Sequence, residues 1–178
     1  MQRRLVLSAA VASSASLIGC ASPQVGDYAS QTPTLDLAQY FSGSVDAHGI
    51  FQGRSGQIAR RFTVVMECSW KGNEGVLDEA FTYSDGTTQR RIWRLTKHAD
   101  GHYTGTADDV VGTARGQTQG NAFRWGYTLA LPVDGKVYHV DFDDWMYLID
   151  ERVMLNRATM SKFGVRLGEI TLSFTKRT

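Results

Sequence analysis

Carboxylate, amide and guanidinium side chains gather in residues 136–164, among many aromatic residues. Read with a period of two, one face of this stretch carries the apolar row Tyr138, Val140, Phe142, Met146 and Leu148. Asp144 lies in the same row. A period of two is typical of a strand that turns one side toward a core. Because a carboxylate in an apolar row is costly unless it is paired or hydrogen-bonded, we expect Asp144 to have a partner.

The next hydrophobic segment offers Asn156 and Arg157 as partners of Asp144. We expect these three side chains to fix the polar head of a ligand inside the fold. Arg157 is the natural partner of a fatty-acid carboxylate, because a guanidinium can bind a carboxylate through two parallel hydrogen bonds. The apolar wall of such a pocket would come from Trp70, Trp93, Phe123, Trp125 and Phe142. In the alternative, Arg157 and the neighbouring aromatic residues only close the fold.

Three further charged residues lie in phase with apolar neighbours on other predicted strands. They are Arg60, Glu79 and Arg91. We expect them to line one end of the interior as a paired network, or else to lie at the rims, solvated or in salt bridges. The phase of Arg91 is weakly determined, because a slip of one residue reverses every side chain in a strand. A tight turn at Asp85-Gly86 would instead turn Arg90 and Arg94 toward Glu79.

We find no complete catalytic or metal-binding arrangement in the sequence. The pairs His98 with His102, and His139 with Asp141, fall short of the three or four ligands that a zinc site needs. We therefore predict no metal, no cofactor and no catalytic residue. In one alternative the protein is an enzyme acting on a lipid acyl chain, with Asp144 as a general base whose pKa is raised by its apolar surroundings.

The N-terminal residues 1–19 have the order of a lipoprotein signal peptide. Two arginines precede an apolar segment, residues 5–18, which is shorter than the roughly 20 residues of a membrane-spanning helix. The sequence Leu-Ile-Gly that leads to Cys20 resembles the bacterial lipobox, whose cysteine carries lipid. The alternative is an ordinary secretory signal with an incidental cysteine.

A lipidated Cys20 would place the protein in the bacterial cell envelope. Ala21 replaces the aspartate that resembles an inner-membrane retention signal, so we expect the outer membrane, facing the periplasm. Residues 20–33 are small, polar and proline-marked, and we expect them to form a flexible lipidated tether. Cys68 lies in an apolar row, and we expect a buried, unreactive thiol.

Composition favours one all-β domain over residues 34–178. The chain has 178 residues, 42% of them hydrophobic, and 18 glycines against 3 prolines. Removing the leader takes the formal net charge from +1 to about −1, which argues against nucleic acid as a partner. Residues 34–41 could form a short helical turn capped by Thr34.

The turn signals divide the rest of the chain into short predicted strands. We place them at 44–52, 58–70, 75–84, 88–97, 102–107, 110–117, 121–131, 136–149, 152–160 and 166–176, with hairpin turns at Asp85-Gly86, Asp100-Gly101 and Asp134-Gly135. About 8–10 sequential antiparallel strands predict an up-and-down barrel, which leaves no exposed edge. A two-sheet sandwich is the alternative.

Several blocks of the sequence resemble one bacterial lipoprotein family, domain of unknown function 3833. The blocks are DAHGIFQGRSGQIARRFTV, DGTTQRRIW, DDVVGTARGQTQGNAFRWGY, LPVDGKVYHVDFDDWMYLID and NRATMSKFGVRLGEITLSF. The resemblance extends from about Leu35 to the C-terminus and implies no established activity. Members of this family are often encoded near enzymes that modify membrane fatty acids, which implies work linked to lipids. The predicted barrel is similar to the lipocalin (calycin) class, a likeness of fold alone.

These observations favour a ligand-binding barrel. We predict an outer-membrane lipoprotein that holds a lipid or fatty-acyl molecule, or another small amphipathic ligand, inside the barrel. Besides the enzyme, a second alternative is a structural or assembly partner in the envelope. In that case the outward-facing Trp145 and Tyr147 would bind another envelope protein.

Overall fold

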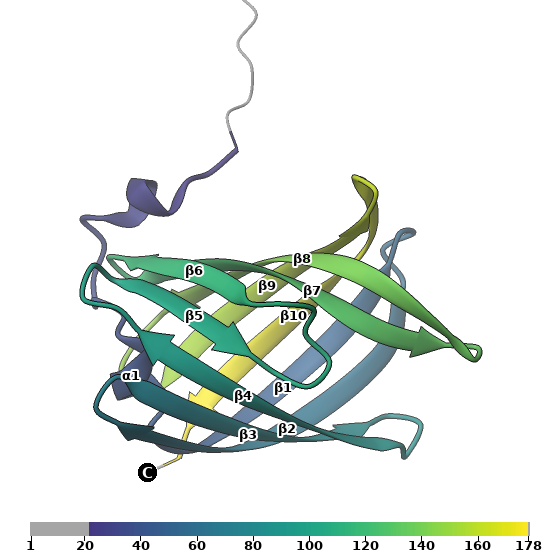
Figure 1. The fold of residues 1–178 in the computed structure, drawn as a ribbon, viewed down its shortest axis with the longest axis horizontal. Coiled ribbons are helices and arrows are strands. Elements are labelled where there is room, and N and C mark those ends of the chain that lie inside the picture. The colour runs from purple at the N-terminus through teal and green to yellow at the C-terminus, as the bar shows by residue number, and fades with distance from the viewer. Residues whose placement is uncertain (1–21, 178) are drawn as a thin grey trace, which may run out of the picture.

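Ten antiparallel strands pair with their neighbours in the chain and close into a barrel when β1 pairs with β10 (Figure 1). The computed structural model describes residues 22–177. The strands are β1 (Gly43–Gly53), β2 (Ile58–Lys71), β3 (Glu74–Tyr83), β4 (Thr88–Lys97), β5 (His102–Thr106), β6 (Ala114–Gln119), β7 (Ala122–Val133), β8 (Lys136–Leu148), β9 (Val153–Lys162) and β10 (Val165–Lys176). The predicted up-and-down barrel is confirmed.

Alternation along the strands places the core inside the barrel. In β2, Phe62, Val64, Met66 and Cys68 are buried and the residues between them are exposed, as period two requires. The three predicted Asp-Gly turns are present, each with its glycine at positive φ. At Asp134-Gly135 both residues have positive φ, 49° and 75°, which a two-residue hairpin turn favours.

The predicted strand at 110–117 is the main error in the strand assignment. Strand β6 begins at Ala114, and residues 107–113 form a connection in which Gly112 has a φ of 74°. Val110 makes an isolated bridge to Leu129 of β7. A pattern of apolar residues cannot distinguish such a single bridge from a strand.

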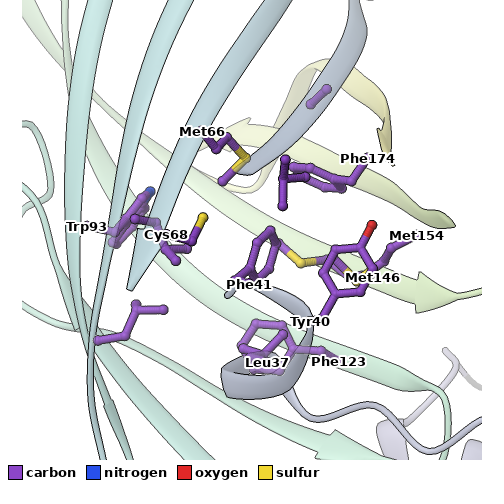
Figure 2. Close-up of a cluster of buried hydrophobic side chains, with 14 of the residues drawn as sticks. Leu37, Tyr40, Phe41, Met66, Cys68, Trp93, Phe123, Met146, Met154 and Phe174 are labelled. Carbon is purple, nitrogen blue, oxygen red and sulfur yellow. The ribbon is translucent and has the colours of Figure 1, made fainter. Parts of the chain in front are cut away.

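A short helix, α1 (Leu37–Tyr40), closes one end of the barrel (Figures 1 and 2). Its buried side chains pack into the core, and the Trp70 indole donates a hydrogen bond to the carbonyl of Phe41 at 2.9 Å. The N-cap is Asp36 rather than the predicted Thr34. The Asp36 carboxylate accepts from the amide of Ala38 and pairs with Lys97 at 2.6 Å, which ties α1 to β4.

Residues 22–33 differ from the flexible tether that the sequence predicted. They contain a short 3-10 helix, η1 (Val25–Tyr28), which lies against β6 and β7 outside the barrel (Figure 1). The Tyr28 ring lies 5.8 Å from that of Trp145 and 5.3 Å from that of Tyr147. The chain itself therefore covers the two aromatic residues predicted to bind an envelope partner, and Trp145 is buried.

The predicted leader, residues 1–19, and the lipidation site at Cys20 lie outside the described residues. Within residues 22–177, no helix has the length and apolar character needed to cross a membrane.

Candidate ligand-binding site

The barrel encloses a cavity of about 280 Å³. Leu37 and Phe41 of the α1 segment line it at one end, and Arg60, Tyr83 and Gln89 line it near the opposite end, which we call the distal end. Most of the remaining lining side chains are aliphatic or aromatic. Of the residues predicted to form an apolar wall, Trp93, Phe123, Trp125 and Phe142 line the cavity, whereas Trp70 does not. A cavity of this kind suits the apolar part of a small molecule.

A continuous row of aromatic rings forms one side of the cavity. The Trp93 and Trp125 rings are 4.6 Å apart, and Trp125 lies 5.3 Å from Tyr127. Tyr127 stacks on Phe142, its neighbour in the β7–β8 register, at 5.0 Å and an interplanar angle of 9°. These rings come from three strands, and each contact between them adds to the packing of the wall.

A charged group interrupts the apolar lining where β3 and β4 pair. Glu79 is opposite Arg91 in the register, and both side chains point into the barrel. Arg91 binds the Asp109 carboxylate through both Nε and Nη2, with an Nη2–Oδ2 distance of 2.6 Å. Its Nη1 lies 4.0 Å from Glu79. Within residues 22–177 no side chain or backbone amide donates a hydrogen bond to the Glu79 carboxylate, although its side chain is only 12% exposed.

Burial controls the proton affinity of the Glu79 carboxylate. Loss of solvent raises the pKa of Glu79 to about 7, even though Arg91 opposes the shift. Burial alone would lower the pKa of Arg91, but the hydrogen bonds to Asp109 and the charge of Glu79 raise it overall, so Arg91 stays cationic. Glu79 can therefore take up or release a proton near neutral pH while Arg91 keeps its charge.

Arg60 lies at the distal end and is half-exposed. Its guanidinium is 3.6 Å from the centre of the Tyr83 ring, and Nη2 binds Asp85 at 2.6 Å and also the Thr87 hydroxyl. The Nε atom is buried without a hydrogen-bond partner in the described structure. Arg60 thus lies at the barrel rim in a salt bridge, which was one of the two predicted alternatives, whereas Glu79 and Arg91 lie in the interior.

Asp144 is buried and has partners, as its place in the apolar row requires. Its carboxylate accepts hydrogen bonds from Asn156 Nδ2, from Trp125 Nε1 at 3.2 Å and from Tyr127 Oη at 3.1 Å. Burial raises the pKa of Asp144 against the effect of these donors. Neither Asp144 nor Asn156 lines the cavity, because the Trp125 and Tyr127 rings do. The two residues support the aromatic wall from behind.

The prediction that Arg157 binds Asp144 inside the barrel is wrong. In β9 the side chain of Asn156 points inward, so that of Arg157 must point outward. The Arg157 side chain is 64% exposed and pairs with Glu169 of β10 at 2.7 Å. An outward guanidinium cannot reach a ligand in the cavity.

Two polar residues of the site, Tyr127 and Asp109, were not among the predicted site residues. Tyr127 lies in phase with Phe123, Trp125 and Leu129 in the sequence, and only its hydroxyl distinguishes it from these apolar neighbours. Asp109 lies in the connection before β6, and no local pattern in the sequence pairs it with Arg91, which is 18 residues away. Among residues 22–177, no three His, Cys, Asp or Glu side chains are placed to hold a metal ion.

The family model for the protein of unknown function DUF3833 matches residues 14–176. The chain belongs to the DUF3833 family. No curated protein matches it in sequence. The barrel is similar to the S-type phycobiliprotein lyase from Guillardia theta, with 7% identity, a TM-score of 0.61, and coverage of 88% of this chain and 99% of that one. It is also similar to a DUF3598-family protein of unknown function from Nostoc punctiforme, with 10% identity and a TM-score of 0.56, over 83% of this chain and 51% of that one. At these identities the likeness shows the fold alone.

Proposed function

We propose that this DUF3833 barrel binds one small amphipathic molecule of lipid type. The observation that carries the proposal is the cavity inside the barrel, whose aromatic and aliphatic walls are interrupted on one side by Glu79 and Arg91. An apolar chain would lie between α1 and the Trp93–Trp125–Tyr127 wall. The polar end would lie against Glu79, on the path from the middle of the cavity to the distal end.

The charges of the site favour a polar end that donates hydrogen bonds. Arg91 and Arg60 are already bound to Asp109 and Asp85, so neither is free to neutralise a ligand carboxylate. Among the charged residues that line the cavity in the described structure, Glu79 is the carboxylate, it accepts no hydrogen bond, and it is an acceptor whenever it is ionised. A hydroxyl or ammonium group would satisfy it, whereas a carboxylate would bring a second negative charge next to it. The proposed ligand class is therefore a long-chain alcohol or amine rather than the fatty acid that Arg157 suggested.

The affinities of three probes with the same chain and different polar ends test this assignment. We expect dodecylamine and dodecanol to bind a chain that begins at Ser22 at least tenfold more tightly than dodecanoate, because a buried unmatched charge costs more than about 1 kcal/mol. Isothermal titration calorimetry at concentrations below aggregation measures this. Equal or tighter binding of dodecanoate would contradict the hydrogen-bond-donor assignment, and failure of all three probes would contradict the cavity proposal.

Glu79→Gln separates the role of the charge from that of the cavity. The variant keeps the shape of the side chain but cannot ionise, so we expect dodecylamine to lose its advantage over dodecanol. In the native chain, dodecylamine should bind more tightly as the pH rises through about 7, because Glu79 becomes anionic while Arg91 stays cationic. Glu151→Gln, an exposed residue on the β8–β9 turn, is the matched control and should leave binding unchanged.

Attachment to the outer membrane through a lipidated Cys20 is also part of the proposed function. It rests on the sequence of the leader, and mass spectrometry of the N-terminal peptide from the native membrane tests it. A chain that retains residues 1–19, or that carries an unmodified Cys20, would contradict it.

A further inference from the structure

Three neighbouring hairpins at the distal end expose large apolar side chains. They join β1 to β2, β7 to β8 and β9 to β10, and they are adjacent because β8 pairs with β9 and β10 pairs with β1 (Figure 1). We call the six exposed apolar residues on these hairpins the rim patch: Ile58, Val133, Val137, Tyr138, Phe163 and Val165. Phe163 is 91% exposed and Val137 is 64% exposed, so the barrel does not shield them.

The packing of the barrel does not explain why a phenylalanine occupies position 163. It occupies the first position of the β9–β10 turn with a φ of 52°, followed by Gly164 at 74°. Turns with two positive φ angles favour asparagine, aspartate or glycine at this position, and a bulky residue is disfavoured there. Because its ring is almost fully exposed, packing in the barrel gives no compensation.

The β7–β8 hairpin extends beyond its neighbour. The β8–β9 register begins at Asp141 and Ser161, so residues 136–140 of β8 have no partner in β9. Every residue from 132 to 139 is exposed. The hairpin thus carries Val133, Val137 and Tyr138 outward, away from the core.

Basic residues accompany the rim patch. Arg54, Lys136, Lys162 and Arg166 lie on the same three hairpins, where the acids are Asp134 in the β7–β8 turn and Glu169, the partner of Arg166. The Lys162 ammonium lies 5.0 Å from the centre of the Tyr138 ring and 5.2 Å from that of Phe163. Arg166 pairs with Glu169 and is 58% exposed. The other two distal connections carry the acids Asp85, Asp108 and Asp109 instead. Because Asp85 pairs with Arg60 and Asp109 pairs with Arg91, the distal end is basic on the side of the rim patch and nearly balanced in charge on the other side.

We propose that the rim patch and its basic residues bind the surface of an anionic lipid bilayer. Apolar side chains mixed with lysine and arginine are the composition of surfaces that insert into the interface of anionic membranes. A protein partner fits less well, because a stable interface needs roughly 800 Å² of complementary surface on each side, and these side chains stand on separate hairpin tips. Docking in this way turns the distal end of the cavity toward the lipid. The proposal does not depend on what the cavity holds.

Co-sedimentation with vesicles tests this proposal on a chain that begins at Ser22. This chain keeps η1, α1 and all ten strands, and it lacks the apolar leader, which would bind lipid by itself. Vesicles of phosphatidylcholine with and without phosphatidylglycerol are the probes. We expect binding to vesicles that contain phosphatidylglycerol, weakened by added salt. The double variant V137S and F163S should bind at least tenfold more weakly, because two apolar side chains no longer enter the interface.

The matched control replaces two exposed aliphatic residues on the outer wall of the barrel. Val65→Ser with Leu155→Ser removes two exposed apolar side chains away from the distal end, and it should leave vesicle binding unchanged. The charge-reversal variant K136E with K162E should abolish the preference for phosphatidylglycerol. Absence of binding to anionic vesicles at low salt would overturn the proposal. It would also be overturned if V137S with F163S and Val65→Ser with Leu155→Ser lost vesicle affinity equally.

Discussion

The burial of the Glu79 carboxyl leads to a prediction about the pH dependence of stability, which can be tested without a ligand. Its pKa is raised from 4.5 to about 7 in the folded barrel, mainly because burial removes solvent. An unfolded chain ionises at the ordinary value, so between about pH 4.5 and pH 7 the folded state holds more protons than the unfolded state. The free energy of unfolding therefore falls as the pH rises across this range. At about 1.4 kcal/mol for each unit of pKa, the loss is of the order of 1–3 kcal/mol once residual solvent in the cavity is allowed for.

Glu79→Gln removes this loss, because glutamine does not ionise. We expect the variant to be more stable than the native chain at about pH 8 by of the order of 1–3 kcal/mol, and close to it at about pH 4.5, where Glu79 is protonated. Urea unfolding followed by tryptophan fluorescence at several pH values measures the difference. The control Glu151→Gln should follow the native curve, since that side chain is exposed. If the free energy of unfolding of Glu79→Gln differed from that of the native chain by the same amount at every pH, this result would refute the argument.

Three further changes probe the surroundings of the site. Asp144→Ala leaves three buried donors without an acceptor, and we expect it to lower the free energy of unfolding by about 2–4 kcal/mol in urea; a loss below about 0.5 kcal/mol would contradict the hydrogen-bond network. Arg157→Ala removes an exposed ion pair and should change stability by less than about 1 kcal/mol in the same assay. It should also leave the affinity for dodecylamine unchanged, and a loss of binding would restore the carboxylate role that the sequence suggested. Burial raises the pKa of the Cys68 thiol to about 12, so Cys68 should not react with a disulfide reagent at about pH 8 until the barrel unfolds; rapid reaction in the folded state would contradict its burial.

The fold could be predicted because local patterns determine most of it. The alternation Phe62, Val64, Met66 and Cys68 orients β2, and the Asp-Gly pairs define the turns, so the order of strands follows from the sequence. Sequential strands that all bury one face have few arrangements other than a closed barrel. The connection at residues 107–113 is the exception, since its apolar residues have no regular partner strand.

The site was less predictable because it depends on partners that are distant in the sequence. Asn156 and Arg157 are adjacent in a strand, so only one of them can point inward, and the buried amide was favoured over the charge. The pairing of Arg91 with Asp109 depends on how one irregular connection folds back over the barrel. The covering of Trp145 by Tyr28 joins segments more than a hundred residues apart, and the strand pattern alone showed only that Trp145 points outward.

Native mass spectrometry of the chain beginning at Ser22, purified without detergent, tests the central claim most directly. We predict that one dodecylamine molecule binds each chain, and that Met160→Trp, which fills the cavity from β9, prevents this binding. Leu155→Trp, on the outer face of the same strand, should bind as the native chain does. If the native chain takes up no amphipathic molecule, or if Met160→Trp binds it as well as the native chain, the cavity is not a ligand-binding site.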